Sequence, residues 1–363
     1  MVHVSGPEPT DEMRTPAAAD GRVDGSRLMP DTAGASGVDP QATPRRARRP
    51  GLQRAVENVV HECVRVQPGE DLLIVCDIDT QLLAERLRDA GRAAGADVVL
   101  TSMDARAMHG EEPPAAVAAA MLRCDAYLAA TKRSLSHTRA RHAATEAGVR
   151  GATLPGVTAP MLARLMSGDL ETIARRSCSI ARLLDAATEA RVTCPRGSDM
   201  TFELLGRDAT ADDGDLSRAA AFGNLPCGEA FIAPRSGQGE VVVTSIGSLG
   251  VSDPPARLTI REGSLVDAEG ALGRDLLETL LAHGRAGCNL AELGVGTNDR
   301  ATLTGNVLED EKLLGSVHVA FGASAAIGGT VAVPIHLDAI VVDASLWIDG
   351  EQVLDAGRLV LDE

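Results

Sequence analysis

The pattern that most constrains the fold is an alternation of apolar, strand-like runs with amphipathic, helix-like segments between residues 52 and 155. The strand-like runs are DLLIVCD (71–77), ADVVLTSM (96–103), CDAYLAA (124–130) and VRGATLPG (149–156). Strands joined by helices of this length pair in parallel, with the helices packed on the faces of the sheet. We therefore predict an α/β N-terminal domain over residues 50–185, with a parallel sheet flanked by helices.

Beyond about residue 185 the apolar runs become shorter and more closely spaced. Only one long helical segment, at residues 271–287, interrupts them. Short strands at close spacing are typical of antiparallel sheets, because a tight turn can join antiparallel neighbours. We predict a β-rich α+β C-terminal domain over residues 186–363 that carries a metal site. The boundary between the two domains is expected between residues 175 and 192.

Residues 1–49 differ from the rest of the chain. They are rich in Pro, Gly, Ala, Asp and Arg, end in the basic cluster PRRARRP, and show neither the helical nor the strand period of apolar residues. Such a segment cannot bury enough apolar surface to offset the entropy of ordering. We predict a disordered N-terminal tail, with the basic cluster as a solvated linker.

Charge and composition exclude several classes of partner. The chain carries 51 acidic and 35 basic residues, a formal charge of −16, with one Tyr, one Trp and four Phe. A nucleic-acid-binding surface needs basic and stacking side chains, so no nucleic-acid partner is expected. There is no apolar run of membrane-spanning length, and the seven cysteines form no C-x-x-C pair. We expect a cytoplasmic protein with reduced thiols and no membrane partner.

Two polar residues, His336 and Asp338, interrupt the apolar run TVAVPIHLDAIVV. Because side chains alternate across a strand, these two point to the same face. A buried Asp is costly unless it is paired, protonated or bound to a cation, so the pair indicates either a metal site or a structural His–Asp hydrogen bond. His318 lies in the preceding strand-like run, GSVHVAFG. If the two strands pair, the three side chains form a minimal ligand set for a catalytic divalent metal.

Two carboxylates, Glu229 and Glu292, interrupt apolar stretches of the same predicted domain. Each by itself could be an exposed charge at a strand edge. Together with Asp338 they provide three negative charges, which two divalent cations and a bridging hydroxide would nearly neutralise. We therefore predict a site for two divalent cations formed by Glu229, Glu292, His318, His336 and Asp338, with Glu229 or Glu292 also transferring a proton.

Weaker candidates lie elsewhere in the chain. Ser136 is predicted to cap the helix that follows the third strand, with His137, Thr138 and Arg141 near the site as substrate-binding residues. The acidic triplet 309–311 is interpreted as the first turn of a helix, where acids favour the dipole. There is no G-x-G-x-x-G motif and no phosphate-binding loop after any of the four strands, so a nucleotide is not indicated.

Several motifs of the last 140 residues resemble one enzyme family. NLPCGEAFIAP, AELGVGTN, TGNVLEDEKLLGSVHVAFG and PIHLD are similar, in the same order, to the M29 metalloaminopeptidases (the aminopeptidase T group). The resemblance extends from about residue 52 to the C-terminus and places that family's metal ligands on Glu229, Glu292, His318, His336 and Asp338. It also implies a homodimer. These peptidases carry a Tyr shortly after the first ligand His, whereas GASAAIGG contains none.

The chain also resembles, at the HLD motif, the 2,5-dihydroxypyridine dioxygenases of the same superfamily. Those enzymes have a His in place of Glu292 and an aromatic residue in place of His318, so the ligand set is closer to that of the hydrolases. We therefore predict a divalent-metal hydrolase, using two Zn, Co or Mn ions, in which metal-activated hydroxide attacks an amide-like bond of a small molecule or short peptide. The alternatives are a mononuclear non-haem Fe(II) dioxygenase that opens a dihydroxypyridine-like or catecholic ring, and a metal-stabilised binding protein.

Overall fold

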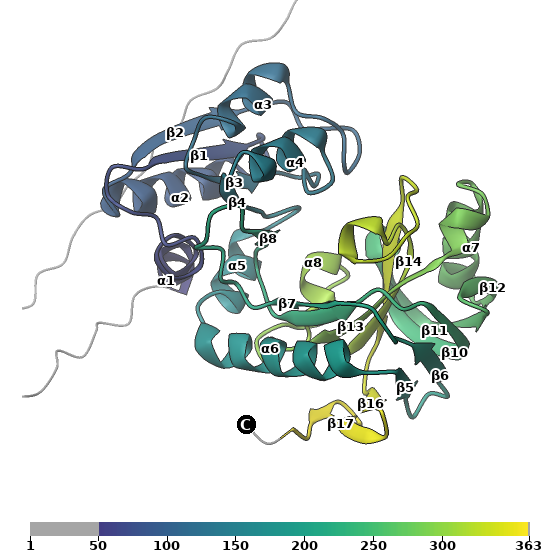
Figure 1. Ribbon diagram of the computed structural model, residues 1–363. Coiled ribbons are helices and arrows are strands. Elements are labelled where there is room, and N and C mark those ends of the chain that lie inside the picture. The colour runs from purple at the N-terminus through teal and green to yellow at the C-terminus, as the bar shows by residue number, and fades with distance from the viewer. Residues whose placement is uncertain (1–50, 362–363) are drawn as a thin grey trace, which may run out of the picture. The chain divides into compact units, whose positions relative to one another are not determined.

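A computed structural model describes residues 51–361, and the predicted N-terminal tail lies outside this range (Figure 1). The first sheet has five parallel strands in the order β2–β1–β3–β4–β8, which confirms the predicted parallel sheet. Its strands are β1 (Asp71–Cys76), β2 (Asp97–Ser102), β3 (Ala126–Ala130), β4 (Arg150–Thr153) and β8 (Phe222–Asn224). Because β8 comes from beyond residue 185, the chain returns to this sheet after the boundary expected from the sequence.

Helices cover both faces of the first sheet. Alternate residues of β1 point to opposite faces, so Leu72 and Ile74 pack in one apolar cluster and Leu73 and Val75 in another. The first cluster is completed by α1 (Gly51–Asn58), its π-helical extension η1 (Val59–Cys63), α2 (Gln81–Ala93) and α5 (Ala159–Leu165), and the second by α3 (Ala115–Met121) and α4 (Arg139–Glu146). The helices predicted between the strands are thus present.

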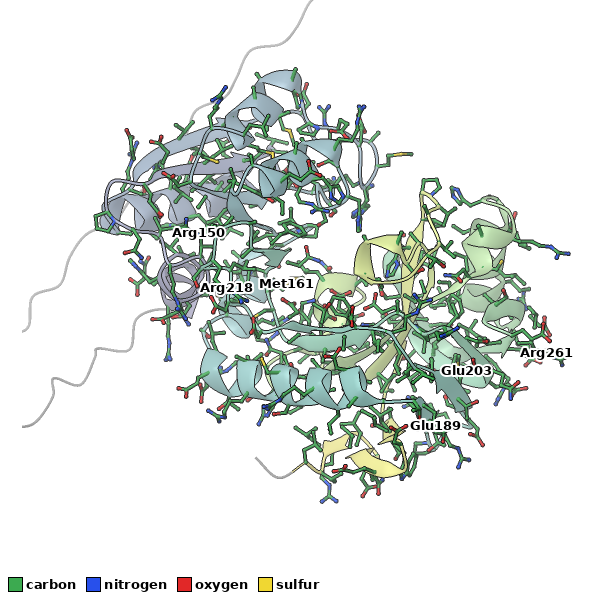
Figure 2. All side chains as sticks on the ribbon, viewed as in Figure 1. Arg150, Met161, Glu189, Glu203, Arg218 and Arg261 are labelled. Carbon is green, nitrogen blue, oxygen red and sulfur yellow. The ribbon has the colours of Figure 1, made fainter. Side chains whose placement is uncertain are left out.

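One charged side chain is buried beside this sheet. Arg150 of β4 donates from Nε to the carbonyl of Val64 at 3.0 Å and pairs with Glu70. By contrast, Glu189 and Arg261 stay exposed on the second sheet (Figure 2). Since burying an unpaired charge is costly, the Glu70 carboxylate is what makes Arg150 tolerable at this position.

The second sheet has thirteen strands and is largely antiparallel, which confirms the β-rich character predicted for the C-terminal half. Its main path runs β18–β17–β16–β5–β6–β10–β15–β14–β13–β9–β7, and β11 and β12 extend it from β10. The strands are β5 (Glu189–Thr193), β6 (Asp199–Glu203), β7 (Ala209–Asp212), β9 (Glu229–Ile232), β10 (Ser236–Ile246), β11 (Gly250–Arg261), β12 (Ser264–Glu269), β13 (Leu290–Gly296), β14 (Val317–Gly322), β15 (His336–Val341), β16 (Ser345–Ile348), β17 (Glu351–Asp355) and β18 (Arg358–Leu359).

One face of this sheet is apolar and carries the long helix α6 (Leu170–Ala186), which runs beside β7 and β9 (Figure 1). Ile180 and Leu184 of α6 belong to the same buried cluster as Val295 and Val319 of the central strands. The helix α7 (Ala271–Leu281) packs against β11 and β12, and the four-residue helix α8 (Val307–Asp310) precedes β14. The opposite face of the central strands is therefore left for polar residues. No helix within residues 51–361 is long and apolar enough to cross a membrane.

Candidate metal centre

The strand register places all five predicted ligands on one face of four adjacent strands. In β14 and β15, His318 lies opposite Ile340, Ala320 opposite Asp338 and Gly322 opposite His336. Residues two apart share a face, so His318, His336 and Asp338 point the same way. Glu292 of β13 and Glu229 of β9 are brought onto this face by the pairing of β13 with both β14 and β9. The predicted pairing of the two histidine strands is confirmed.

Glu292 lies between the two imidazoles. Its Oε1 is 3.2 Å from Nε2 of His318, and its Oε2 is 3.2 Å from Nε2 of His336. Each carboxylate oxygen thus faces a different histidine. A carboxylate in this position can ligate one cation through each oxygen, as in sites that hold two metals.

The remaining two carboxylates lie on either side of this arrangement. Oε2 of Glu229 is 3.5 Å from Nε2 of His318, and Oδ1 of Asp338 is 3.4 Å from Nε2 of His336. Glu292, His336 and Asp338 each offer a ligand atom, and these atoms all lie within 4.8 Å of one another. The side chains of His318 and Glu229 are almost fully buried, whereas that of His336 is 24% exposed. The centre is thus open to solvent on its His336 side.

The surroundings of the imidazoles favour metal binding through Nε2. Nδ1 of His336 lies 2.7 Å from the carbonyl oxygen of Ala323, to which it donates, and this leaves Nε2 as the ligand atom. Gly294 lies directly opposite His318, and a Cβ at this position would overlap the His318 ring. The ring therefore lies over the backbone of β13. Oε2 of Glu229 is buried and accepts no hydrogen bond, as expected of an atom that faces a cation.

The charges of the centre are tightly coupled. Burial by itself would raise the pKa of Glu292, but hydrogen bonds from His318 and His336 outweigh it and lower this pKa to about 2. Burial would lower the pKa of His318, but the hydrogen bond to Glu292 and the charge of Glu229 raise it to about 9. The pKa of His336 is raised well above its ordinary value, against its burial, by Asp338 and Glu292. Without a metal, both imidazoles therefore hold protons that a cation must displace.

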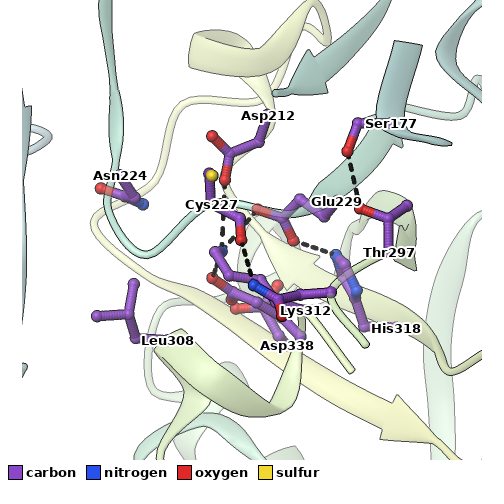
Figure 3. A network of polar contacts seen from close by, with 12 residues as sticks. Ser177, Asp212, Asn224, Cys227, Glu229, Thr297, Leu308, Lys312, His318 and Asp338 are labelled. Carbon is purple, nitrogen blue, oxygen red and sulfur yellow. Dashed lines mark hydrogen bonds and ion pairs between the residues drawn. The ribbon is translucent and has the colours of Figure 1, made fainter. Parts of the chain in front are cut away.

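The structure adds one residue that the sequence analysis missed, Lys312. Its side chain is fully buried beside the metal centre (Figure 3). Nζ donates to Glu229 Oε1 at 3.0 Å and to Glu311 Oε1 at 2.6 Å, and lies 3.7 Å from Oδ2 of Asp212. The sequence shows only the charged run EDEK (309–312) shortly before an apolar strand, and this run by itself does not indicate that Lys312 is buried.

Two residues of the acidic triplet, Glu309 and Asp310, lie in the first turn of α8 as predicted, and Glu311 is the C-cap residue of this helix. The side chains of Glu309 and Asp310 are not solvated. Glu309 accepts hydrogen bonds from Arg164 of α5 and from Thr302. Asp310 is completely buried and accepts from the backbone N–H groups of Thr304 and Gly305. The interpretation as a helix turn that simply complements the dipole is therefore incomplete, because two of the acids fix the loop before α8.

Two carboxyls around Lys312 have raised pKa values. Burial outweighs the attraction of Lys312 and raises the pKa of Asp212 to about 7. For Glu311, burial together with the nearby charges of Glu229 and Asp338 raises the pKa to about 8, again against Lys312. Lys312 itself stays charged, since its carboxylate neighbours raise its pKa well above the ordinary value in spite of burial.

The three predicted substrate-binding residues occupy different environments. His137 is exposed, and its pKa is lowered by desolvation and then by the positive charge of His336. Thr138 caps α4 by accepting from the N–H of Arg141, so the predicted cap at Ser136 is wrong by two residues. Arg141 is buried, donates to the carbonyl of Ser136 at 2.6 Å and lies over the ring of Phe222. Of the three residues, only His137 has a pKa that is affected by the charges of proposed metal ligands, His336 and Asp338.

Comparison with known proteins gives both a family and a fold. Residues 52–361 match the family NicX, described as 2,5-dihydroxypyridine 5,6-dioxygenase. The solved 2,5-dihydroxypyridine dioxygenase of Pseudomonas putida KT2440 is 20% identical, with a TM-score of 0.74 over 86% of this chain and 97% of its own. AmpT of Thermus thermophilus is 17% identical, with a TM-score of 0.63 over 86% of this chain and 99% of its own. No curated protein matches the sequence.

Both resemblances noted in the sequence are thus confirmed, and at these identities the two solved structures establish the fold alone. The match to the family covers nearly the whole described chain, including every residue of the metal centre. The chain belongs to the NicX family, described as 2,5-dihydroxypyridine 5,6-dioxygenase.

Proposed function

We propose that this protein is a divalent-metal hydrolase that holds two cations and cleaves an amide-like bond in a small substrate. The observation that carries this proposal is the position of Glu292, whose two oxygens face the Nε2 atoms of two different histidines at 3.2 Å. A mononuclear site needs only one such oxygen. With Glu292 shared, His318 and Glu229 complete one ligand set, and His336 and Asp338 complete the other.

The residues present fit such cations. All five are oxygen or imidazole donors, as divalent metals of this kind require, and the unpartnered Oε2 of Glu229 faces His318. Cations held there would activate a water molecule and polarise the carbonyl of the substrate. The open His336 side is where a substrate can enter, since His336 and Asp338 are the most exposed of the five.

Proton transfer requires a group that does not serve as a ligand. The sequence analysis assigns this role to Glu229 or Glu292, but in the proposed two-cation centre each of these residues serves as a ligand. Glu311 is a better candidate, because its pKa of about 8 suits a general acid–base group at neutral pH. We expect Glu311→Gln to lower kcat about 100-fold and to leave the metal content unchanged. Loss of metal in this variant would instead make Glu311 part of the metal site.

The substrate need not be the kind of peptide that M29 peptidases cleave. The Tyr of those peptidases has no equivalent here, because the single tyrosine, Tyr127, is buried in the core of the first sheet. A phenol that could stabilise an oxyanion is therefore missing from the centre. His137 is proposed to contact the substrate, with Thr138 and Arg141 holding the loop that carries it. We also propose that the protein acts as a homodimer.

A second candidate is a mononuclear Fe(II) dioxygenase acting on a dihydroxypyridine-like or catecholic ring. It is favoured by the family match and by the compact group of Glu292, His336 and Asp338, which could hold a single ion. In this case His318 and Glu229 would support the ligands without binding a cation.

Activity assays distinguish the two candidates. Protein loaded under anaerobic conditions with Zn²⁺, Co²⁺, Mn²⁺ or Fe²⁺ would be tested against amino-acid amides, short peptides and dihydroxypyridines, with and without oxygen. Amide hydrolysis that needs no oxygen, and that His336→Ala abolishes, is the expected result. Ring opening that depends on both Fe²⁺ and oxygen, without amide hydrolysis, would overturn the hydrolase proposal.

A further inference from the structure

The charge distribution around the two halves of the metal centre is unequal. On the His318 side, Glu229 is already paired with a buried ammonium group, since Nζ of Lys312 donates to its Oε1 at 3.0 Å. On the His336 side, neither Glu292 nor Asp338 is paired with any lysine or arginine within residues 51–361. The ion pairs that these two carboxylates form are with the imidazoles of His318 and His336. A cation on the His336 side therefore meets uncompensated carboxylates.

Lys312 has no alternative position. Its side chain is completely buried, and its other contacts are to Glu311 and Asp212. The carbonyl of Lys312 also accepts from the N–H of Asn298, which fixes the backbone at this residue. A lysine held in this way acts as a permanent charge. If its side chain left this position, the buried carboxyl groups of Glu229, Glu311 and Asp212 would lose the cation that they share.

We infer that Lys312 is a resident cation that weakens metal binding on the His318 side, so that the two ions bind with unequal affinity. The His336 side then holds its ion tightly, while the His318 side exchanges its ion at working concentrations. This inference rests on the proposed function only in that the His318 side can bind an ion at all. The physical basis is repulsion between an ammonium group and a divalent cation that approach the same carboxylate in a buried environment.

Calorimetric titration of the full-length, metal-free protein with Co²⁺ tests the inference. We expect two binding events in the wild type, with affinities at least tenfold apart. In Lys312→Met the weaker event should strengthen about tenfold or more, and the tighter event should change little. Lys312→Gln, which keeps a hydrogen-bond donor without the charge, should give the same shift. When Glu229→Gln is combined with Lys312→Met, the weaker binding event should disappear.

A second readout keeps the test decisive if removal of Lys312 destabilises the fold. Lys312→Met should melt below the wild type without metal, because buried carboxylates lose their partner. It should then gain more in melting temperature than the wild type when Co²⁺ is added. Arg150→Met is the matched control, since Arg150 is a buried cation paired with Glu70 in the first sheet. It should melt lower but respond to Co²⁺ as the wild type does.

The outcomes separate this inference from the proposed function. Two events of equal affinity in the wild type, or an unchanged weaker event in both Lys312 variants, would overturn the role of Lys312 and leave the hydrolase proposal standing. A single event in the wild type that becomes two in Lys312→Met would support the role of Lys312. It would at the same time contradict the hydrolase proposal.

Discussion

A glycine decides whether His318 can lie where it does. Because a Cβ at position 294 would overlap the His318 ring, we expect Gly294→Ala to displace the imidazole and to lower the bound metal by about one ion per chain. The overpacking should also reduce the free energy of unfolding by about 1–3 kcal/mol. Elemental analysis and urea unfolding measure the two effects.

Gly51→Ala is the control, since its Cβ would make only an ordinary contact, 3.6 Å from the carbonyl oxygen of Ala163. Wild-type metal content in Gly294→Ala would show that the ring does not need this space.

The raised pKa of His318 predicts how the metal-free protein responds to pH. The folded-state pKa is about 9 against an ordinary value of 6.5, so the stabilisation is fully present below about pH 6.5 and is lost as the pH rises through about 9. We expect the free energy of unfolding to fall by on the order of 2 kcal/mol over this range. His336, whose pKa is also raised, adds to the same trend.

Urea unfolding in the presence of a chelator, from pH 6.5 to 9.5, measures this change. His318→Gln is the comparison, because the part of the slope that His318 contributes should disappear in it. A stability that is flat over this range in the wild type would mean that the imidazoles are neutral in the metal-free protein.

The five proposed ligands were identifiable from the sequence for a physical reason. A polar side chain in an apolar strand must have a partner, and His318, His336 and Asp338 stood out on that ground. Lys312 could not be assigned in the same way, because it lies in a charged run between two elements. Only the folded chain shows that this run is buried, since burial there depends on β7 and β9, which are distant in sequence.

At the level of elements, the short helix α8 is held in place by side chains. Four residues cannot form a stable helix by themselves. Asp310 anchors it by accepting from the N–H of Thr304 at 2.7 Å, the N–H of Gly305 at 3.0 Å and the hydroxyl of Ser245 at 2.7 Å. The buried carboxylate of Asp310 therefore fixes, together with that of Glu309, the segment that carries Lys312 into the candidate metal centre.

Removal of that carboxylate should be severe. Asp310→Ala removes a completely buried carboxylate that accepts from the backbone N–H groups of Thr304 and Gly305 and from the buried hydroxyl of Ser245, so we expect a loss of about 3 kcal/mol in the free energy of unfolding. Ser245→Ala removes only one of the hydrogen bonds and should cost about 1 kcal/mol. Urea denaturation of both variants gives the comparison. Equal losses in the two variants would contradict the anchoring role of Asp310.

The elements were predictable where their apolar pattern was long. The strands β1–β4, β10, β13 and β14 and the helices between them follow from periodicity. The strands β8 and β7 were missed, because their residues, FGN and ATAD, do not lie in an apolar run. Their pairing is decided by tertiary contacts: β8 joins β4 in the first sheet, and β7 pairs with β9 beside Glu229.

For the whole molecule, the sequence predicts that residues 1–48 can be removed. This segment lies outside the described residues, and the prediction rests on its composition, which cannot bury apolar surface. We expect the truncated protein to keep its melting temperature within about 2 °C and its metal content. Thermal unfolding and elemental analysis of both lengths give the comparison. A fall of several degrees would show that the segment contributes to the fold.

The number of ions per chain tests the central claim most directly. Wild-type protein and Glu229→Gln would be equilibrated by dialysis against saturating Co²⁺ without oxygen, and the bound metal would be counted by elemental analysis. A centre in which Glu292 is shared between two ligand sets predicts two ions in the wild type and one in Glu229→Gln, held by His336, Asp338 and Glu292. One ion in both proteins would contradict the two-cation centre.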